Sequence, residues 1–67
     1  METLEILTPR ELEIIDYLSH GLNARQIGEI LFISEHTVIA HRKNILHKTR
    51  AKNTAHLVRY AMETGMI

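Results

Sequence analysis

The chain has 67 residues, of which 45% are hydrophobic, 24% charged and 4% aromatic, and it contains no cysteine. This length allows one domain with one small core and leaves little room for a walled catalytic cleft, and the lack of cysteine excludes disulfides and thiolate metal ligands. The formal net charge is zero, so any preference for a charged partner must come from how the charges are distributed.

Helix-start signals recur along the chain. Residues 8–11 read Thr-Pro-Arg-Glu, a capping box with proline at the first helical position. Residues 23–26 read Asn-Ala-Arg-Gln and repeat this arrangement with an asparagine cap. Ser34 can cap a third helix, and Asn53 or Thr54 can start a fourth.

Two glycines fit helix ends, because Gly21 and Gly65 can adopt the left-handed conformation that terminates a helix. We therefore predict four helices and no strand, at residues 9–20, 24–31, 35–49 and 54–64. The fold class is all-α, a four-helix bundle forming a single domain over residues 1–67. Helical periodicity assigns the core-facing positions: Leu12, Ile15 and Leu18 or Ser19; Ile27, Ile30 and Leu31; Val38, Ile45 and Thr49, with His41 at the margin; and Leu57, Tyr60, Ala61 and Thr64.

Only residues 32–34 separate the second predicted helix from the third. So short a link forces the two to cross at a large angle, as in a helix-turn-helix. Gly28 suits a close approach of the two backbones, since a glycine inside a helix otherwise costs about 1 kcal/mol relative to alanine. The third helix would then protrude and fit a B-DNA major groove. When its helical rotation is continued to position 50, six residues are expected to point away from the core: His36, Ile39, Ala40, Lys43, His47 and Arg50.

The charges are unevenly distributed along the chain. Five acids and one arginine lie within the first sixteen residues, whereas no acid occurs between His36 and Tyr60. That second stretch carries six lysines and arginines and four histidines. A short run of this kind is commonly a solvated face, but more than twenty residues without an acid favour a polyanionic partner.

The stretch LTPRELEIIDYLSHGLNARQIGEILFISEHTVIAHRKNILHK, followed by the ending LVRYAMETGMI, resembles the LuxR-type (GerE-like) helix-turn-helix domain. The resemblance covers almost the whole chain, from about residue 4 to residue 67. It implies a DNA-binding domain for transcription regulation, of the kind found at the C-terminus of bacterial response regulators and quorum-sensing regulators. We expect it here as the output domain of a two-component response regulator.

The resemblance also implies a set of site residues. Bases would be read by Thr37, Ile39, Ala40 and Lys43. Phosphates would be held by Asn23, Ala24, Arg25, Ser34, Arg42, Lys48, Lys52 and Asn53. An apolar stripe on the fourth helix, formed by Ala55, Val58 and Met62, is either ordinary surface or the contact of a homodimer assembled on DNA. RNA polymerase is a further candidate partner.

Three positions depart from the family pattern within the third helix and its end, and Phe32 stands in a turn that often contains glycine. Ile39 replaces a polar residue and could contact thymine methyl groups. Thr49 replaces a core leucine, so its hydroxyl should bond back along the helix. Arg50 stands where glycine or asparagine usually ends the helix, and must adopt a positive φ or extend the helix by a turn.

Other functions fit the sequence less well. We expect no enzyme, catalytic residue, metal site or cofactor, because the histidines of the third helix lack the spacing that brings two ligands together on one face. The longest apolar run, residues 30–33, is too short for a membrane span, and no signal-peptide pattern is present, so a soluble cytoplasmic protein is expected. A sigma-factor-like promoter-binding domain and a helix-turn-helix for protein contact remain as alternatives.

Overall fold

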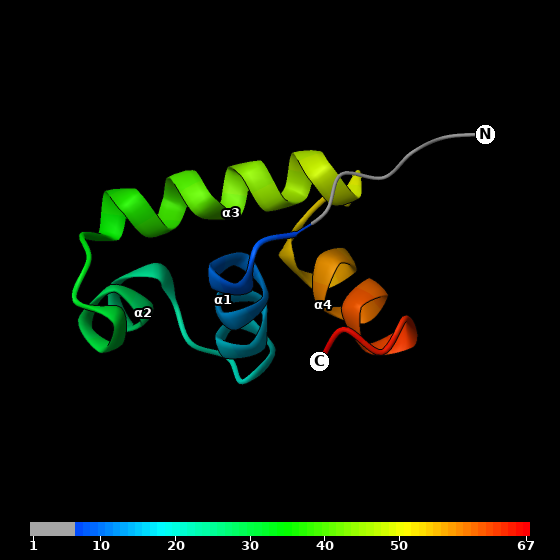
Figure 1. Ribbon diagram of the computed structural model, residues 1–67, viewed down its shortest axis with the longest axis horizontal. Coiled ribbons are helices and arrows are strands. Elements are labelled where there is room, and N and C mark those ends of the chain that lie inside the picture. Colours follow the sequence, from blue (N-terminus) through cyan, green and yellow to red (C-terminus); the bar gives the residue numbers. More distant parts are fainter. Residues whose placement is uncertain (1–6) are drawn as a thin grey trace.

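The computed structural model describes residues 7–67 as four helices joined by short turns (Figure 1). They are α1 (Pro9–Ser19), α2 (Ala24–Leu31), α3 (Glu35–Thr49) and α4 (Thr54–Glu63). The predicted all-α fold is confirmed, and each predicted helix is found with ends that agree within one residue. The start of the predicted domain, including the acids at Glu2 and Glu5, lies outside the described residues.

The predicted helix caps are all formed. Thr8 accepts the backbone N–H of Glu11 at 3.1 Å and donates its own N–H to the Glu11 carboxylate at 2.8 Å. Asn23 and Gln26 make the same reciprocal pair, with both distances 2.9 Å. The remaining two helices are capped by Ser34 and Asn53, whose side chains accept first-turn N–H groups. These local bonds stabilise the four helix starts independently of long-range packing.

The core lies where α1 is covered by α3 and α4, and where α2 packs against α3. Its fully buried side chains are Ile14, Ile15, Ile27, Val38, Ile45, Leu57 and Ala61. The buried face of α1 is wider than predicted and includes Ile14, because this helix contacts two others, while Leu12 is only half-buried.

Two predicted core positions are wrong. Ile30 is 44% exposed, because the packed stripe of α2 centres on Ile27, Gly28 and Leu31 and leaves Ile30 on the flank. Thr64 is exposed as the C-cap of α4, where its hydroxyl donates to the carbonyl of Tyr60 at 2.8 Å.

The turn between α2 and α3 closes on Gly28. A β-carbon at this position would lie 2.6 Å from the carbonyl oxygen of Ile33, so the predicted close approach is confirmed. The N–H groups of Phe32 and Ile33 both donate to the Gly28 carbonyl. Phe32 ends α2 with φ of 58° and is 94% exposed. A bulky residue thus occupies a left-handed position that glycine adopts without strain.

The end of α3 is altered as the sequence indicated. The Thr49 hydroxyl donates to the carbonyl of Ile45 at 2.8 Å, which confirms the predicted bond back along the helix. Arg50 takes φ of 60°, so of the two predicted outcomes the positive φ occurs and the helix is not extended.

Candidate nucleic-acid interface

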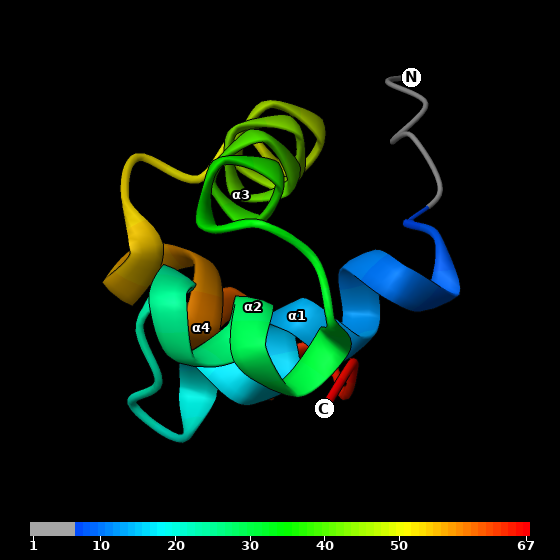
Figure 2. The same cartoon turned by 90° about the vertical axis from the view of Figure 1, so that its left-hand side faces the viewer.

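The longest helix, α3, lies along one side of the molecule with α2, α1 and α4 beneath it (Figure 1), and the view along its axis agrees (Figure 2). None of the other described helices covers its outer side. His36, Ala40, Lys43 and His47 are exposed there, as periodicity predicted, whereas Val38 and Ile45 are buried on the opposite side. The protein therefore presents a convex, acid-poor helix face.

The four predicted base-reading residues lie on or beside this outer face. Thr37, Ala40 and Lys43 are exposed, and Ile39 is half-buried at the margin. The Thr37 hydroxyl is held in the first turn of α3 by a 2.9 Å hydrogen bond with the Ser34 hydroxyl. Asn44 is also exposed on this helix, although the sequence did not single it out.

The start of α2 carries three of the predicted phosphate-binding residues. Asn23 is exposed and uses its side chain to cap the helix, while Ala24 occupies the first helical position and is half-buried. The exposed Arg25 lies 4.0 Å from Glu29, a loose surface pair that contributes little. First-turn N–H groups and the helix dipole make such a terminus favourable for an anion.

A second group of these residues lies along α3 and in the turn that follows it. Arg42 is half-buried on the flank of α3, whereas Lys52 and Asn53 are exposed between α3 and α4. Asn53 is the cap of α4, and the Lys52 backbone N–H donates to Nδ1 of His56 at 3.1 Å. Within residues 7–67, the structure records no salt bridge for Arg42, Lys43 or Lys52.

Lys48 has a partner that the sequence did not predict. Its Nζ donates to Oε1 of Glu11 at 2.9 Å, and Glu11 is only 4% exposed. Burial alone would raise the pKa of the Glu11 carboxyl. The hydrogen bond and charge of Lys48, together with the Thr8 hydrogen bonds, outweigh burial and hold this pKa below its ordinary value of 4.5. The capping box indicated a local role for Glu11, but nothing in the pattern connects positions 37 residues apart.

The predicted dimer stripe is at the opposite end of the molecule from α2 (Figure 1). Ala55 and Met62 are exposed and Val58 is half-buried. Together with Leu18 of α1, these three residues line a shallow, largely apolar depression. The stripe is therefore a continuous apolar surface rather than scattered residues.

The sequence of residues 5–61 matches the family described as "Bacterial regulatory proteins, luxR family". The chain belongs to this family. It is accordingly a helix-turn-helix domain of a DNA-binding, transcription-regulating type, and the family is not one of enzymes. In the described part of the chain, no helix is long and apolar enough to cross a membrane.

Known relatives carry the same domain as part of a longer chain. The LuxR-type domain is 36% identical over 66 residues to the oxygen regulatory protein NreC of Staphylococcus carnosus, covering 98% of this chain and 30% of NreC. It is 42% identical over 66 residues to the transcriptional activator protein SolR of Ralstonia solanacearum, covering 98% of this chain and 28% of SolR.

A solved structure of a response regulator contains a domain with the same fold. The crystal structure of the response regulator ChrA, from a heme-sensing two-component system, superposes with a TM-score of 0.90 at 35% identity. The match covers 98% of this chain and 33% of ChrA. The LuxR-type domain thus spans about a third of the length of these proteins.

Proposed function

We propose that the domain reads double-stranded DNA by placing α3 in the major groove. The observation that carries this proposal is the uncovered outer face of α3, where Thr37, Ala40 and Lys43 are exposed and no acid follows Glu35. A helix of this kind fills the groove, and its exposed side chains reach base edges. Lys43 donates to guanine acceptors, and Ala40 leaves room for a close approach to the bases.

Ile39 gives the reading face an apolar element. It is half-buried beside Ala40 rather than projecting fully into solvent. An aliphatic side chain at the margin of a major-groove helix suits the methyl group of thymine, which only the major groove displays. We therefore propose that Ile39 favours an A·T pair at its position in the operator.

Phosphates would be bound on both flanks of α3, the proposed recognition helix. One site is the start of α2, where Asn23, Ala24 and Arg25 lie at a helix N-terminus. Ser34, at the start of α3, adds a hydroxyl, and Arg42 lies along the flank of α3. The other site is the turn that contains Lys52 and Asn53. Contacts of this kind set the register of the protein on DNA without specifying sequence.

The α4 stripe formed by Ala55, Val58 and Met62 is proposed as a dimer contact. It lies at the far end of the molecule from α2 (Figure 1), so two copies joined there would leave both α3 helices uncovered. Two-fold dimers bind two half-sites on DNA. One short helix offers a small interface, so we expect association on DNA rather than in free solution.

We further propose that the domain is the output domain of a response regulator that acts on chromosomal DNA in the cytoplasm. Support comes from its similarity to the response regulator ChrA and from its span of about a third of such chains. RNA polymerase is a candidate partner at the promoter. A sigma-factor-like promoter domain is a weaker alternative, because the luxR-family match extends to residue 61 and so into α4.

The experiment is a titration of arbitrary duplex DNA at several salt concentrations. Each phosphate neutralised by a lysine or arginine contributes about −0.9 to the slope of log K against log salt, so Arg25, Arg42 and Lys52 predict a slope of about −2.7 per domain. Arg42→Met should make the slope less steep by about 0.9. A helix-turn-helix used only for protein contact would bind the duplex negligibly at every salt concentration, and that result would overturn the proposal.

A further inference from the structure

The single carboxylate oxygen Oε1 of Glu11 accepts two hydrogen bonds that connect distant parts of the chain. One comes from the Thr8 backbone N–H at 2.8 Å, at the start of α1, and the other from Nζ of Lys48 at 2.9 Å, in the last turn of α3. The carboxylate side chain is 6% exposed and the lysine side chain 22% exposed. The recognition helix is therefore joined to the cap of α1 by a largely buried ion pair.

This pair does not resemble the other ion pairs of the described residues. Those formed by Arg10, Arg25 and Arg59 join residues three or four positions apart on one helix, and their side chains are 44–78% exposed. Water screens such surface pairs, so they fix little. A largely buried pair is screened much less, and removing one member leaves the other charge uncompensated.

From this geometry we infer that Lys48 is a positioning residue in DNA binding, which acts through Glu11 and not by direct contact with a phosphate. The inference rests on the proposed DNA-binding function and changes the role that the sequence assigned to Lys48. The buried Glu11 carboxylate engages the Lys48 ammonium at 2.9 Å and balances its charge, so this cation is less available to a phosphate than an exposed one. Because Lys48 lies in the last turn of α3, its bond to Glu11 holds the end of that helix in place. The turn that contains Lys52 and Asn53 begins there, so its position is fixed as well.

The double variant Glu11→Gln/Lys48→Met separates the two roles, because it removes both charges and leaves the net charge unchanged. Replacing a buried ion pair by neutral groups of similar size is commonly tolerated. Lys48→Met alone leaves the Glu11 carboxylate without its ammonium partner, and so adds a net negative charge beside the recognition helix. Arg42→Met is the matched control for a direct phosphate contact from the same helix.

Duplex affinity is measured for each variant as a function of salt, with thermal unfolding followed on the same samples so that affinity is expressed per folded molecule. Lys48→Met is expected to lose about tenfold in affinity, within the range of coupling between contacting residues, with an unchanged salt slope. The double variant is expected to return to within about threefold of the wild-type affinity at the same slope. Arg42→Met is expected to make the slope less steep by about 0.9.

Three results would overturn the inference. The first is a double variant that binds duplex DNA as weakly as Lys48→Met does, with a salt slope less steep by about 0.9. Such a slope change indicates a lost phosphate contact. The second is wild-type affinity per folded molecule for Lys48→Met, which would leave the pair with a role in stability alone. The third is failure of the double variant to bind although it is folded.

Amine labelling of the wild-type protein tests the inference without a variant that could unfold. Lys48 is expected to react slowly both with and without DNA, whereas Lys43 and Lys52 become protected only when DNA is added. Protection of Lys48 only in the presence of DNA would contradict the inference. If the wild type bound no DNA, the proposed function would fail by itself, and a reactive Lys48 in the free protein would separately disprove the ion pair.

Discussion

Gly28→Ala is expected to destabilise the domain, although alanine is the better helix former by about 1 kcal/mol. The new β-carbon would lie 2.6 Å from the Ile33 carbonyl oxygen, so one backbone must move by almost 1 Å to reach ordinary contact. The Ile33 N–H is bonded to the Gly28 carbonyl at 3.0 Å, so this movement strains that bond as well. Overpacking of about 1–3 kcal/mol and a weakened hydrogen bond of about 1 kcal/mol together exceed the helix-propensity gain.

The net loss for Gly28→Ala is about 1–3 kcal/mol, which corresponds to a decrease in Tm of roughly 5–20 °C for a domain of this size. Thermal unfolding followed by circular dichroism measures it. The matched control is the pair Glu29→Gly and Glu29→Ala at the adjacent exposed position, where alanine should be more stable than glycine by about 1 kcal/mol. A Gly28→Ala protein as stable as the wild type would refute the reasoning that the turn requires a residue without a side chain.

Two further predictions concern other parts of the fold. Because the pKa of Glu11 is lowered, its stabilising contribution is complete above its ordinary value of 4.5 and is lost as pH falls through the lowered pKa. Urea unfolding at pH 7 and pH 3 should therefore show a larger loss for the wild type than for Glu11→Gln/Lys48→Met; equal losses would contradict this. Phe32→Gly should stabilise the domain by about 1 kcal/mol, because glycine adopts the left-handed backbone conformation without strain. Phe32→Ala keeps the strain and should not stabilise the domain. Equal Tm values for the glycine and alanine variants would show that the strain is not significant.

The sequence predicted most of what depends on neighbouring residues. The capping box at Thr8 and Glu11 and the caps at Ser34 and Asn53 are interactions over three positions, so pattern alone identified where each helix begins. The exposed side of α3 followed from helical periodicity in the same way. The hydroxyl of Thr49 could bond only to a nearby carbonyl, and this too was predictable.

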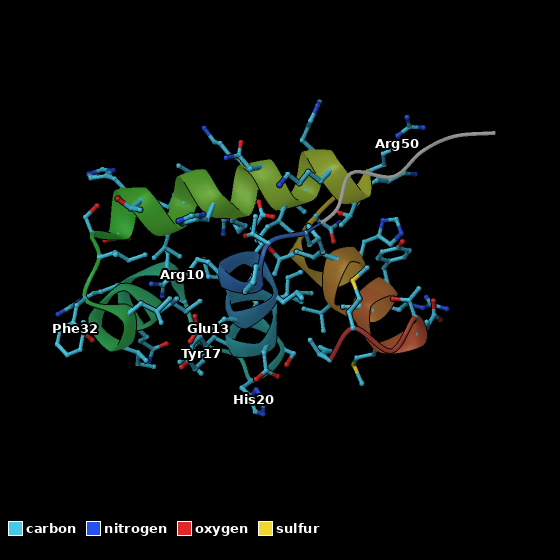
Figure 3. All side chains as sticks on the ribbon, in the orientation of Figure 1. Arg10, Glu13, Tyr17, His20, Phe32 and Arg50 are labelled. Carbon is cyan, nitrogen blue, oxygen red and sulfur yellow. The ribbon has the colours of Figure 1, made fainter. Side chains whose placement is uncertain are left out.

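What the sequence missed depends on contacts between distant segments. Ile30 was assigned to the core because it fits an amphipathic pattern, but only packing against α3 determines which flank of α2 is buried. The choice of the left-handed conformation at Arg50 was one of two outcomes that the sequence allowed. Figure 3 shows Phe32 pointing away from the body of the protein, which no local signal required.

The candidate site was predicted in its general position but not in its internal bonding. Lys48 was predicted to bind a phosphate because it is a cation on the flank of the recognition helix. The Glu11 carboxylate that engages it lies 37 positions away. Charge patterns along a sequence do not reveal which cations are already paired in the folded protein.

The central claim is that α3 reads bases in the major groove, and selection of bound sequences from a random duplex library tests it most directly. The wild-type domain should enrich one motif, and Lys43→Ala should relax preference at one or two base pairs, each with a discrimination of about 1–3 kcal/mol, while the rest of the motif is retained. Enrichment of no motif, or of an identical motif by both proteins, would contradict the assignment of Lys43 and of the outer face of α3 as the reading surface.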